Sequence, residues 1–402
     1  MVRPFNTSAE NGGDQAAAAA IASANVPRPT APPLVQVNGE GDDEATADLY
    51  VDFLILGNKE NYSVRAEKKP VLDSNTQLAH MINGAVTSTT VVDGKYVVRD
   101  VDKDNFEIFV RYLETKFIKF HSPSHMLQML ELASRFQCRQ LEIHCVKELD
   151  LNLTIDHVLE VFRALWYYNS VKPVNAAAAV GGRQQKKKRR QKKKNEQPEG
   201  PVTPEEYFAA LLNNCLQLID MHAEDVLAQQ AILALRFEEL EMIARRDALQ
   251  MSSEMVLLDV LANWSREECS RKNLELSDEN RRRVLGALCY APRYLTMTRK
   301  EFEGVNGLIE LLDPAESKLV GDLLNGRKVT NLTPEQQTMV ANFKQQRPLF
   351  AGMPIQLSAR SNPKNYPKKM RKAAEEAENG EKRNCCNRLF LNCISVLACI
   401  FD

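Results

Sequence analysis

The sequence lacks the features that mark membrane-spanning and secreted proteins. No run of apolar residues reaches the roughly 18 to 20 positions that a membrane-spanning helix needs. The N-terminus has no basic stretch followed by an apolar core, which is the pattern of a secretory signal. We therefore expect an intracellular protein. Its expected place is the cytoplasm, with nuclear import or peripheral association with a membrane as the further alternatives.

The motifs of nucleotide-binding and hydrolytic enzymes are also missing. The sequence contains no GxxxxGK[ST], GxGxxG, HExxH or GxSxG. Its six histidines lie singly: His80, His121, His125, His144, His157 and His222. Cys145 follows His144, but neighbours on a helix point about 100° apart, so these two do not form a nucleophile and its base. We expect no enzymatic activity, no catalytic residue and no cofactor.

Cysteine is not arranged as in a disulfide framework or a zinc site. Five of the nine cysteines are scattered singly: Cys138, Cys145, Cys215, Cys269 and Cys289. The remaining four lie in the last eighteen residues: Cys385, Cys386, Cys393 and Cys399. They form no CxxC pair and have no histidine beside them, so we expect no metal site.

The composition is that of an ordinary soluble chain whose charge is unevenly distributed. The chain has 402 residues, of which 44% are hydrophobic and 26% are charged. This length is enough for roughly two domains of about 150 residues each. The net charge is -1, but residues 183–194 carry nine positive charges and residues 195–359 carry a net charge of -8. The basic segments therefore either fold back on the acidic block or bind an anionic partner elsewhere.

The residue pattern between residues 49 and 99 predicts a small sheet. Residues 49–56 read LYVDFLIL, a run rich in β-branched and aromatic residues that predicts a strand. A second strand around residues 62–65 would complete a hairpin, and KYVVR at residues 95–99 predicts a third strand. A helix is expected from about residue 70 to residue 83.

Helical patterns follow this sheet. Apolar residues recur at spacings of three and four: Phe106, Phe109, Val110, Leu113 and Phe117. They predict a helix packed on the sheet, with Asp102 or Asp104 as its cap. Ser122 and Pro123 would start the next helix. We expect an α+β domain over residues 48–170, a small sheet capped by helices.

The rest of the chain divides by composition. Residues 1–46 have few large apolar side chains and should be a disordered tail. Residues 172–203 form a basic flexible insertion. Helical periodicity resumes at Thr203 and predicts an all-α domain over residues 204–350, and residues 351–402 form a basic, cysteine-rich tail.

The first block resembles a BTB/POZ domain. In that family a strand, a hairpin, a helix, a strand and several helices follow one another in the order read here. The positions that carry the resemblance are Asp48, VDFLILG (51–57), Val71-Leu72, Val101, FEIFVRY (106–112) and LELASRFQCRQLEIHC (130–145).

The second block resembles a BACK domain. The matching positions are Asn214-Cys215, Ile219-Asp220, Phe237, Leu240, Asp247, Leu249, Ser253-Glu254, Val260, Trp264, RYLTMT (293–298) and Glu301-Phe302. These residues also have ordinary structural readings. Asp247 can cap a turn ahead of Leu249, Ser253 and Glu254 open a helix with an acid at its positive end, and Trp264 closes the buried face of that helix.

The resemblance implies a non-enzymatic interaction adaptor. BTB domains generally form homodimers, and many BTB-BACK proteins link a client protein to a cullin-3 ubiquitin ligase. Cullin-binding members commonly carry a hydrophobic residue, any residue and a glutamate after the first helix, but residues 82–94 contain no glutamate. The alternative is therefore a scaffold of the same fold that binds no cullin and acts at a membrane or in the nucleus. No kelch, MATH or zinc-finger segment is present, so we expect any client to be bound by the BACK helices, the tails or a partner, and the sequence does not identify that client.

The basic insertion has three readings. The three hypotheses are a nuclear-import signal, a contact for an anionic partner such as phosphate or lipid, and a solvated insertion without a partner. The candidate residues are Lys186, Lys187, Lys188, Arg189, Arg190, Lys192, Lys193 and Lys194. No aromatic residues are interleaved with them, so we expect no sequence-specific binding of nucleic acid.

The end of the chain combines cysteines with basic and apolar residues. Residues 389–401 read LFLNCISVLACIF, and a helix of that length reaches only about 20 Å, against about 30 Å for a membrane core. Cys385, Cys386, Cys393 and Cys399 are candidate S-acylation sites, which with the nearby positive charge would attach the tail to an anionic membrane. Alternatively, this segment packs against the chain's own helices or a partner.

Overall fold

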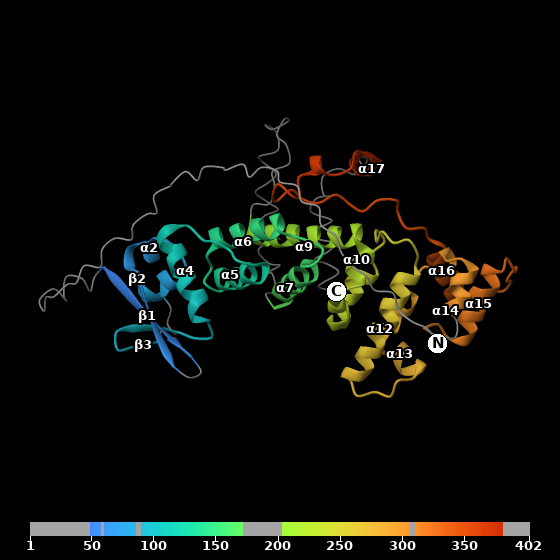
Figure 1. The fold of residues 1–402 in the computed structure, drawn as a ribbon, viewed down its shortest axis with the longest axis horizontal. Helices are drawn as coiled ribbons and strands as arrows, with labels where there is room; N and C mark the ends of the chain where they lie inside the picture. The colour runs from blue at the N-terminus through green and yellow to red at the C-terminus, as the bar shows by residue number, and fades with distance from the viewer. Residues whose placement is uncertain (1–48, 58–59, 86–89, 172–202, 306–310, 381–402) are drawn as a thin grey trace, which may run out of the picture. The chain divides into compact units, whose positions relative to one another are not determined.

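The computed structural model describes residues 49–57, 60–85, 90–171, 203–305 and 311–380 (Figure 1). The expected tail at residues 1–46 and the basic run of the insertion lie outside these residues. The described part consists of a small mixed sheet with helices, followed by a region whose described elements are all helical. This is the fold class that the sequence predicts.

The sheet has four strands in the order β2-β1-β4-β3. The hairpin of β1 (Tyr50–Leu56) and β2 (Asn61–Glu67) is antiparallel, as predicted. Strand β4 (Lys95–Val98) runs parallel to β1, and the two-residue β3 (Val91–Val92) pairs with β4. The sequence did not predict β3, because two residues cannot show the alternation that marks a strand.

Alternation along β1 decides which face of the sheet the helices cover. Val51, Phe53 and Ile55 are buried, and the intervening residues are partly exposed. The Phe53 ring meets the Phe106 ring of α4 (Lys103–Thr115) edge to face at 5.6 Å. Such an arrangement of rings adds stability beyond the burial of apolar area.

The single helix expected over residues 70–83 is two short helices, so that prediction was wrong. Helix α2 (Lys68–Asp73) and helix α3 (Gln77–Ile82) are separated by a turn. In that turn Asn75 adopts the left-handed conformation, with φ of 52°. Asparagine tolerates this conformation better than most residues, and it takes the chain out of the helix.

Helix α4 begins as predicted and ends earlier than expected. Asp102 is its N-cap and accepts a hydrogen bond from the Asn105 backbone N–H at 3.0 Å. The helix stops at Thr115 because Lys116 is left-handed, with φ of 57°. Phe117 therefore lies beyond the helix and is 73% exposed, whereas the sequence pattern placed it on the buried stripe.

Three helices lead from the sheet region to the second helical region. They are α5 (Pro123–Arg135), α6 (Arg139–Leu151) and α7 (Val158–Val171). Ser122 caps α5 through a hydrogen bond from the His125 backbone N–H, as predicted. Helix α9 (Pro204–Met221) begins with a capping box formed by Thr203 and Glu206, a motif that satisfies two backbone donors.

The remaining described elements are helical. They are α10 (Ala223–Leu227), η2 (Gln230–Ala234), α11 (Phe237–Ala244), α12 (Met255–Arg271), α13 (Asp278–Leu285), η3 (Gly286–Tyr290), η4 (Tyr294–Thr296), α14 (Arg299–Val305), α15 (Pro314–Leu324), α16 (Pro334–Lys344), η5 (Pro363–Asn365) and α17 (Lys368–Gly380). One cluster of buried apolar side chains runs from the sheet through α6, α7 and α9 into these helices.

The part of the expected tail that the structure describes is packed rather than free. Within residues 351–380, Ala351, Leu357 and Met370 are buried, and α17 forms at the end. This packing is not predictable from the local sequence, because the segment is basic and has few large apolar residues.

Candidate functional site

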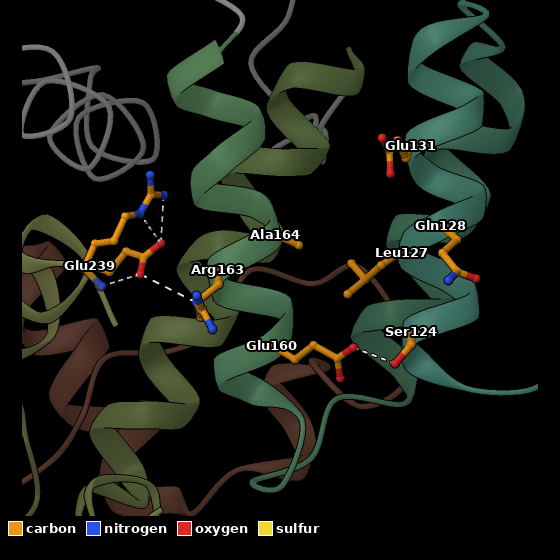
Figure 2. Close-up of a pocket in the computed structure, with 9 residues that line it drawn as sticks. Ser124, Leu127, Gln128, Glu131, Glu160, Arg163, Ala164 and Glu239 are labelled. Carbon is orange, nitrogen blue, oxygen red and sulfur yellow. Dashed lines mark hydrogen bonds and ion pairs between the residues drawn. The ribbon is translucent and has the colours of Figure 1, made fainter. Parts of the chain in front are cut away.

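A groove of about 530 Å³ opens between α5 and α7 (Figure 2). Its lining residues come from α5, from α7 and from the start of α11: Ser124, Leu127, Gln128, Glu131, Glu160, Arg163, Ala164, Arg236 and Glu239. Helix periodicity places the four α5 residues on one face of that helix. Residues of both the sheet-bearing block and the second helical region therefore line the groove.

Charges in the groove are partly neutralised at one end. The Glu239 side chain is only 2% exposed and lies between two guanidinium groups, with Arg236 at 2.9 Å and Arg163 at 3.6 Å. Figure 2 shows the contact between Glu239 and Arg163. A buried carboxylate needs such partners because leaving water is costly for a charge.

The opposite end of the groove is acidic and more open. Glu160 accepts a hydrogen bond from the Ser124 hydroxyl at 2.6 Å, and Glu131 is exposed on the next turns of α5. Leu127 lies between them and is partly buried. An apolar spot beside exposed carboxylates suits a partner segment that carries both apolar and basic side chains.

A second cluster of charges holds the helical region together. Arg246 donates two hydrogen bonds to the buried Asp220, at 2.7 and 2.6 Å, although burial still raises the pKa of Asp220. Arg347 donates to both carboxylate oxygens of Glu254, at 2.5 and 2.9 Å. These contacts join segments that are distant in the sequence, so their role is structural.

The residues that support the BACK resemblance take partly different roles from those expected. Asp247 contacts the Arg293 guanidinium instead of capping a turn. Glu254 stands at the start of α12, as predicted, and its carboxylate accepts hydrogen bonds from Arg347. The Ser253 hydroxyl accepts from the Met255 backbone N–H. Trp264 is fully buried, as predicted, and its indole N–H donates to the Leu235 carbonyl at 2.9 Å.

No reactive thiol emerges among the described residues. Cys138, Cys145, Cys215, Cys269 and Cys289 are all buried. Burial raises the pKa of Cys138, Cys145, Cys215 and Cys289, which keeps these thiols protonated. His144 lies against the Phe120 ring, with 5.6 Å between ring centroids.

Several sequence-predicted sites fall outside the described residues. These are the four candidate acylation sites, Cys385, Cys386, Cys393 and Cys399, and the basic residues from Lys186 to Lys194. Within the described ranges, no group of three or more histidine, cysteine or acidic side chains is placed to hold a metal ion. No helix of that part of the chain has both the length and the apolar character to cross a membrane.

The groove was not predicted from the sequence. Its residues come from three helices and include no unusual motif. Arg236 is more than a hundred positions from Ser124 along the chain, so only the packing of the helices brings them together. The one sequence signal was the presence of Leu127 beside polar residues on α5.

Comparisons with known proteins agree with the architecture. The family model described as "BACK: BTB And C-terminal Kelch" matches residues 206–278. BTB/POZ domain-containing protein 3 of Homo sapiens is 38% identical over 92 residues, which are 23% of this chain and 17% of that protein. BTB/POZ domain-containing protein 6 is 36% identical over 92 residues in Homo sapiens and 31% identical over 106 residues in Xenopus tropicalis, where the match covers 26% of this chain and 20% of that protein.

The chain thus spans a fifth or less of the length of these relatives. The BACK match falls on α9 to α12, where the described structure is helical. The mixed sheet with its helices precedes this region. The BACK match and the similarity to BTB/POZ domain-containing proteins together support a BTB-BACK architecture for this chain, and proteins of that architecture are typically protein-interaction adaptors.

Proposed function

We propose that this protein is a non-enzymatic adaptor that dimerises through residues 48–170 and links a client protein to a cullin-3 ubiquitin ligase. The observation that carries the proposal is the groove between α5 and α7. It is built by both blocks of the chain, and it offers an apolar spot beside exposed carboxylates. It has the shape and chemistry of a surface for another protein.

Exposed apolar residues on the sheet support self-association. They are Leu49, Tyr50, Leu56, Tyr62, Val91 and Val92, which are between 36% and 62% exposed. Val91 and Val92 form β3, an edge strand whose outer backbone groups have no strand partner among the described residues. Edge strands and clustered apolar side chains are surfaces that proteins commonly cover by association.

Cullin-3 is the partner that we assign to the groove. The test is direct binding of purified full-length protein to purified cullin-3, measured by isothermal titration calorimetry. The double variant Leu127→Glu, Glu131→Lys changes the apolar spot and the acidic rim. We expect it to weaken binding at least tenfold.

The matched control is Lys272→Glu, a charge reversal at the exposed residue that follows the last turn of α12, outside the groove. Its expected affinity is that of the native protein, because it leaves the lining residues unchanged. Circular dichroism shows whether each variant keeps its helices. Equal affinity of the groove variant and the control would remove the groove from the proposal, and no binding by the native protein would end the cullin assignment.

A second candidate function is a scaffold that binds no cullin. It is favoured by the absence of glutamate from residues 82–94, where cullin-binding relatives commonly carry one. In this case the basic residues and the C-terminal cysteines would direct the protein to an anionic membrane or to the nucleus.

Acyl labelling in cells tests the membrane form of this second function. Replacement of Cys385, Cys386, Cys393 and Cys399 by serine should abolish labelling and shift the protein from the membrane fraction to the soluble one. An unlabelled native protein would refute acylation. Replacement of the basic residues 186–194 by glutamine tests nuclear import separately, by the protein's distribution between nucleus and cytoplasm.

A further inference from the structure

The end of α6 holds a fully buried carboxylate whose partners come from far along the chain. Asp150 is 0% exposed. Its Oδ2 atom accepts hydrogen bonds from the Ser358 hydroxyl at 2.5 Å and from the Ser361 hydroxyl at 2.7 Å. These residues are 208 and 211 positions away in the sequence. The segment after α16 therefore returns to the junction of α6 and α9.

An arginine completes the environment of this carboxylate. The Arg360 guanidinium donates to Asp150 Oδ1 at 3.0 Å and to the Asp150 carbonyl at 2.6 Å. The carboxylate thus receives one cationic group and two hydroxyl groups from a stretch of four residues. A buried charge requires such a set of donors, because an unpaired carboxylate in the interior is very costly.

A buried amide beside it contacts the backbone of the same segment. Asn214 of α9 is 0% exposed. Its Oδ1 atom accepts from the Ile355 backbone N–H at 2.7 Å, and its Nδ2 group donates to the Ile355 carbonyl at 2.8 Å. The other Nδ2 hydrogen bond goes to Asp150 Oδ1 at 2.8 Å. The Asn214 amide therefore forms hydrogen bonds with both the N–H and the carbonyl of Ile355, as a neighbouring β-strand would.

The segment is also shaped to fit this site. The Ser361 hydroxyl accepts from the backbone N–H groups of Leu357 and Ser358, at 2.8 and 3.1 Å. This hydrogen-bonded turn brings both hydroxyls and the guanidinium to the same side. Leu357 is buried within the apolar core. Backbone pairing, a pocket for a side chain and recognition of charge are each used by proteins that bind peptides.

We propose that Asp150 and Asn214 form a peptide-recognition site for a segment that makes a turn at the pattern Leu-Ser-x-Arg-Ser, and that residues 355–361 occupy it as an internal ligand. The site selects backbone at Ile355 through Asn214, and hydroxyls and a guanidinium through Asp150. It does not accept an anion, since a phosphate on Ser358 would face the Asp150 carboxylate. A peptide of this pattern from a partner competes with the internal segment for the same groups. This site is separate from the groove on α5 and α7, and it does not depend on cullin binding.

The test uses the full-length protein and a fluorescent peptide with the native sequence of residues 351–366. The double variant Arg360→Ala, Ser361→Ala weakens the internal ligand and leaves Asp150 and Asn214 unchanged. Fluorescence anisotropy should show that this variant binds the peptide at least tenfold more tightly than the native protein does. The reason is that the internal segment no longer competes effectively.

Two controls make the result specific. A peptide phosphorylated at Ser358 should bind the variant at least tenfold more weakly, and addition of Asn214→Ala to the variant should reduce binding of the native peptide to the same degree. A scrambled peptide should not bind. Equal binding of the native, phosphorylated and scrambled peptides, or no binding of the native peptide to the weakened variant, would overturn the proposal.

Hydrogen exchange provides a measurement that does not require the weakened variant. In the native protein the amides of Ile355, Leu357 and Ser358 are hydrogen-bonded and should exchange slowly. Asn214→Ala should speed exchange at these three amides at least tenfold and leave those of α15 unchanged. Fast exchange of these amides in the native protein would show that the internal ligand is not held, and would also overturn the proposal.

Discussion

The ion pair between Glu254 and Arg347 offers the sharpest test of how the helical region is held together. Glu254 opens α12 and Arg347 follows α16, and their side chains are 7% and 11% exposed. Arg347 donates two hydrogen bonds to the carboxylate, and the Arg293 backbone N–H donates a third at 3.1 Å. Removing one member of a buried pair leaves the other charge without its partner, which costs about 3 to 5 kcal/mol of the free energy of unfolding.

The double-mutant cycle Glu254→Gln and Arg347→Met isolates this interaction. Each single variant should lose about 3 to 5 kcal/mol. The double variant has no unpaired charge, so its loss should be smaller than the sum of the two by about 2 to 3 kcal/mol. Urea unfolding followed by circular dichroism at 222 nm measures all four proteins.

An exposed pair serves as the matched control. Arg327 and Asp322 also form an ion pair, at 2.7 Å, but their side chains are 70% and 24% exposed. The coupling in the cycle Arg327→Met and Asp322→Asn should stay below about 1 kcal/mol, because solvent screens exposed pairs. Equal coupling energies in the two cycles, or a loss of less than about 1 kcal/mol in either buried single variant, would show that the Glu254–Arg347 pair does not hold the helical region together.

Three further predictions concern a buried histidine, four buried cysteines and a helix cap. Burial lowers the pKa of His125. The stability that its neutral form contributes is therefore present above the unfolded pKa of about 6.5 and is lost as the pH falls through the folded pKa. His125→Gln should flatten the fall of the urea midpoint between pH 7 and pH 5, and an unchanged slope would argue against this contribution of His125. Burial keeps Cys138, Cys145, Cys215 and Cys289 protonated, so mass spectrometry after iodoacetamide treatment should find these four modified only in denaturant, and their modification in the native protein would contradict the packing. Asp102→Ala removes the N-cap of α4 and should lower stability by about 1 kcal/mol, as measured by the urea midpoint, whereas a neutral effect would show that the cap contributes nothing.

Local patterns in the sequence predict most of the fold. β-Branched and aromatic residues identify β1, capping residues identify the starts of α4 and α5, and helical periodicity identifies the start of α9. These features depend on residues within a few positions of one another. The resemblance to BTB and BACK domains adds the order of the elements.

The errors arise where one residue changes the direction of the backbone. Asn75 divides a predicted helix in two, and Lys116 ends α4 before Phe117. Both adopt the left-handed conformation. An apolar stripe does not report such a change, because the same spacing of residues is present whether or not the helix continues.

The candidate sites depend on contacts that no local pattern contains. Asp150 meets Arg360 across 210 positions, and Glu254 meets Arg347 across 93. The charges of these residues are visible in the sequence, but their pairing is set by how α6, α9 and α12 pack. The segment after residue 350 was for that reason expected to be a tail, although its residues 355–361 are held by buried groups.

The proposed adaptor function is tested most directly by the mass of the complex that the purified full-length protein forms with purified cullin-3. Size-exclusion chromatography with light scattering measures this mass without a label. We expect a dimer of this protein that carries two cullin-3 molecules at micromolar concentrations. A monomer that elutes apart from cullin-3 at the same concentrations would contradict it.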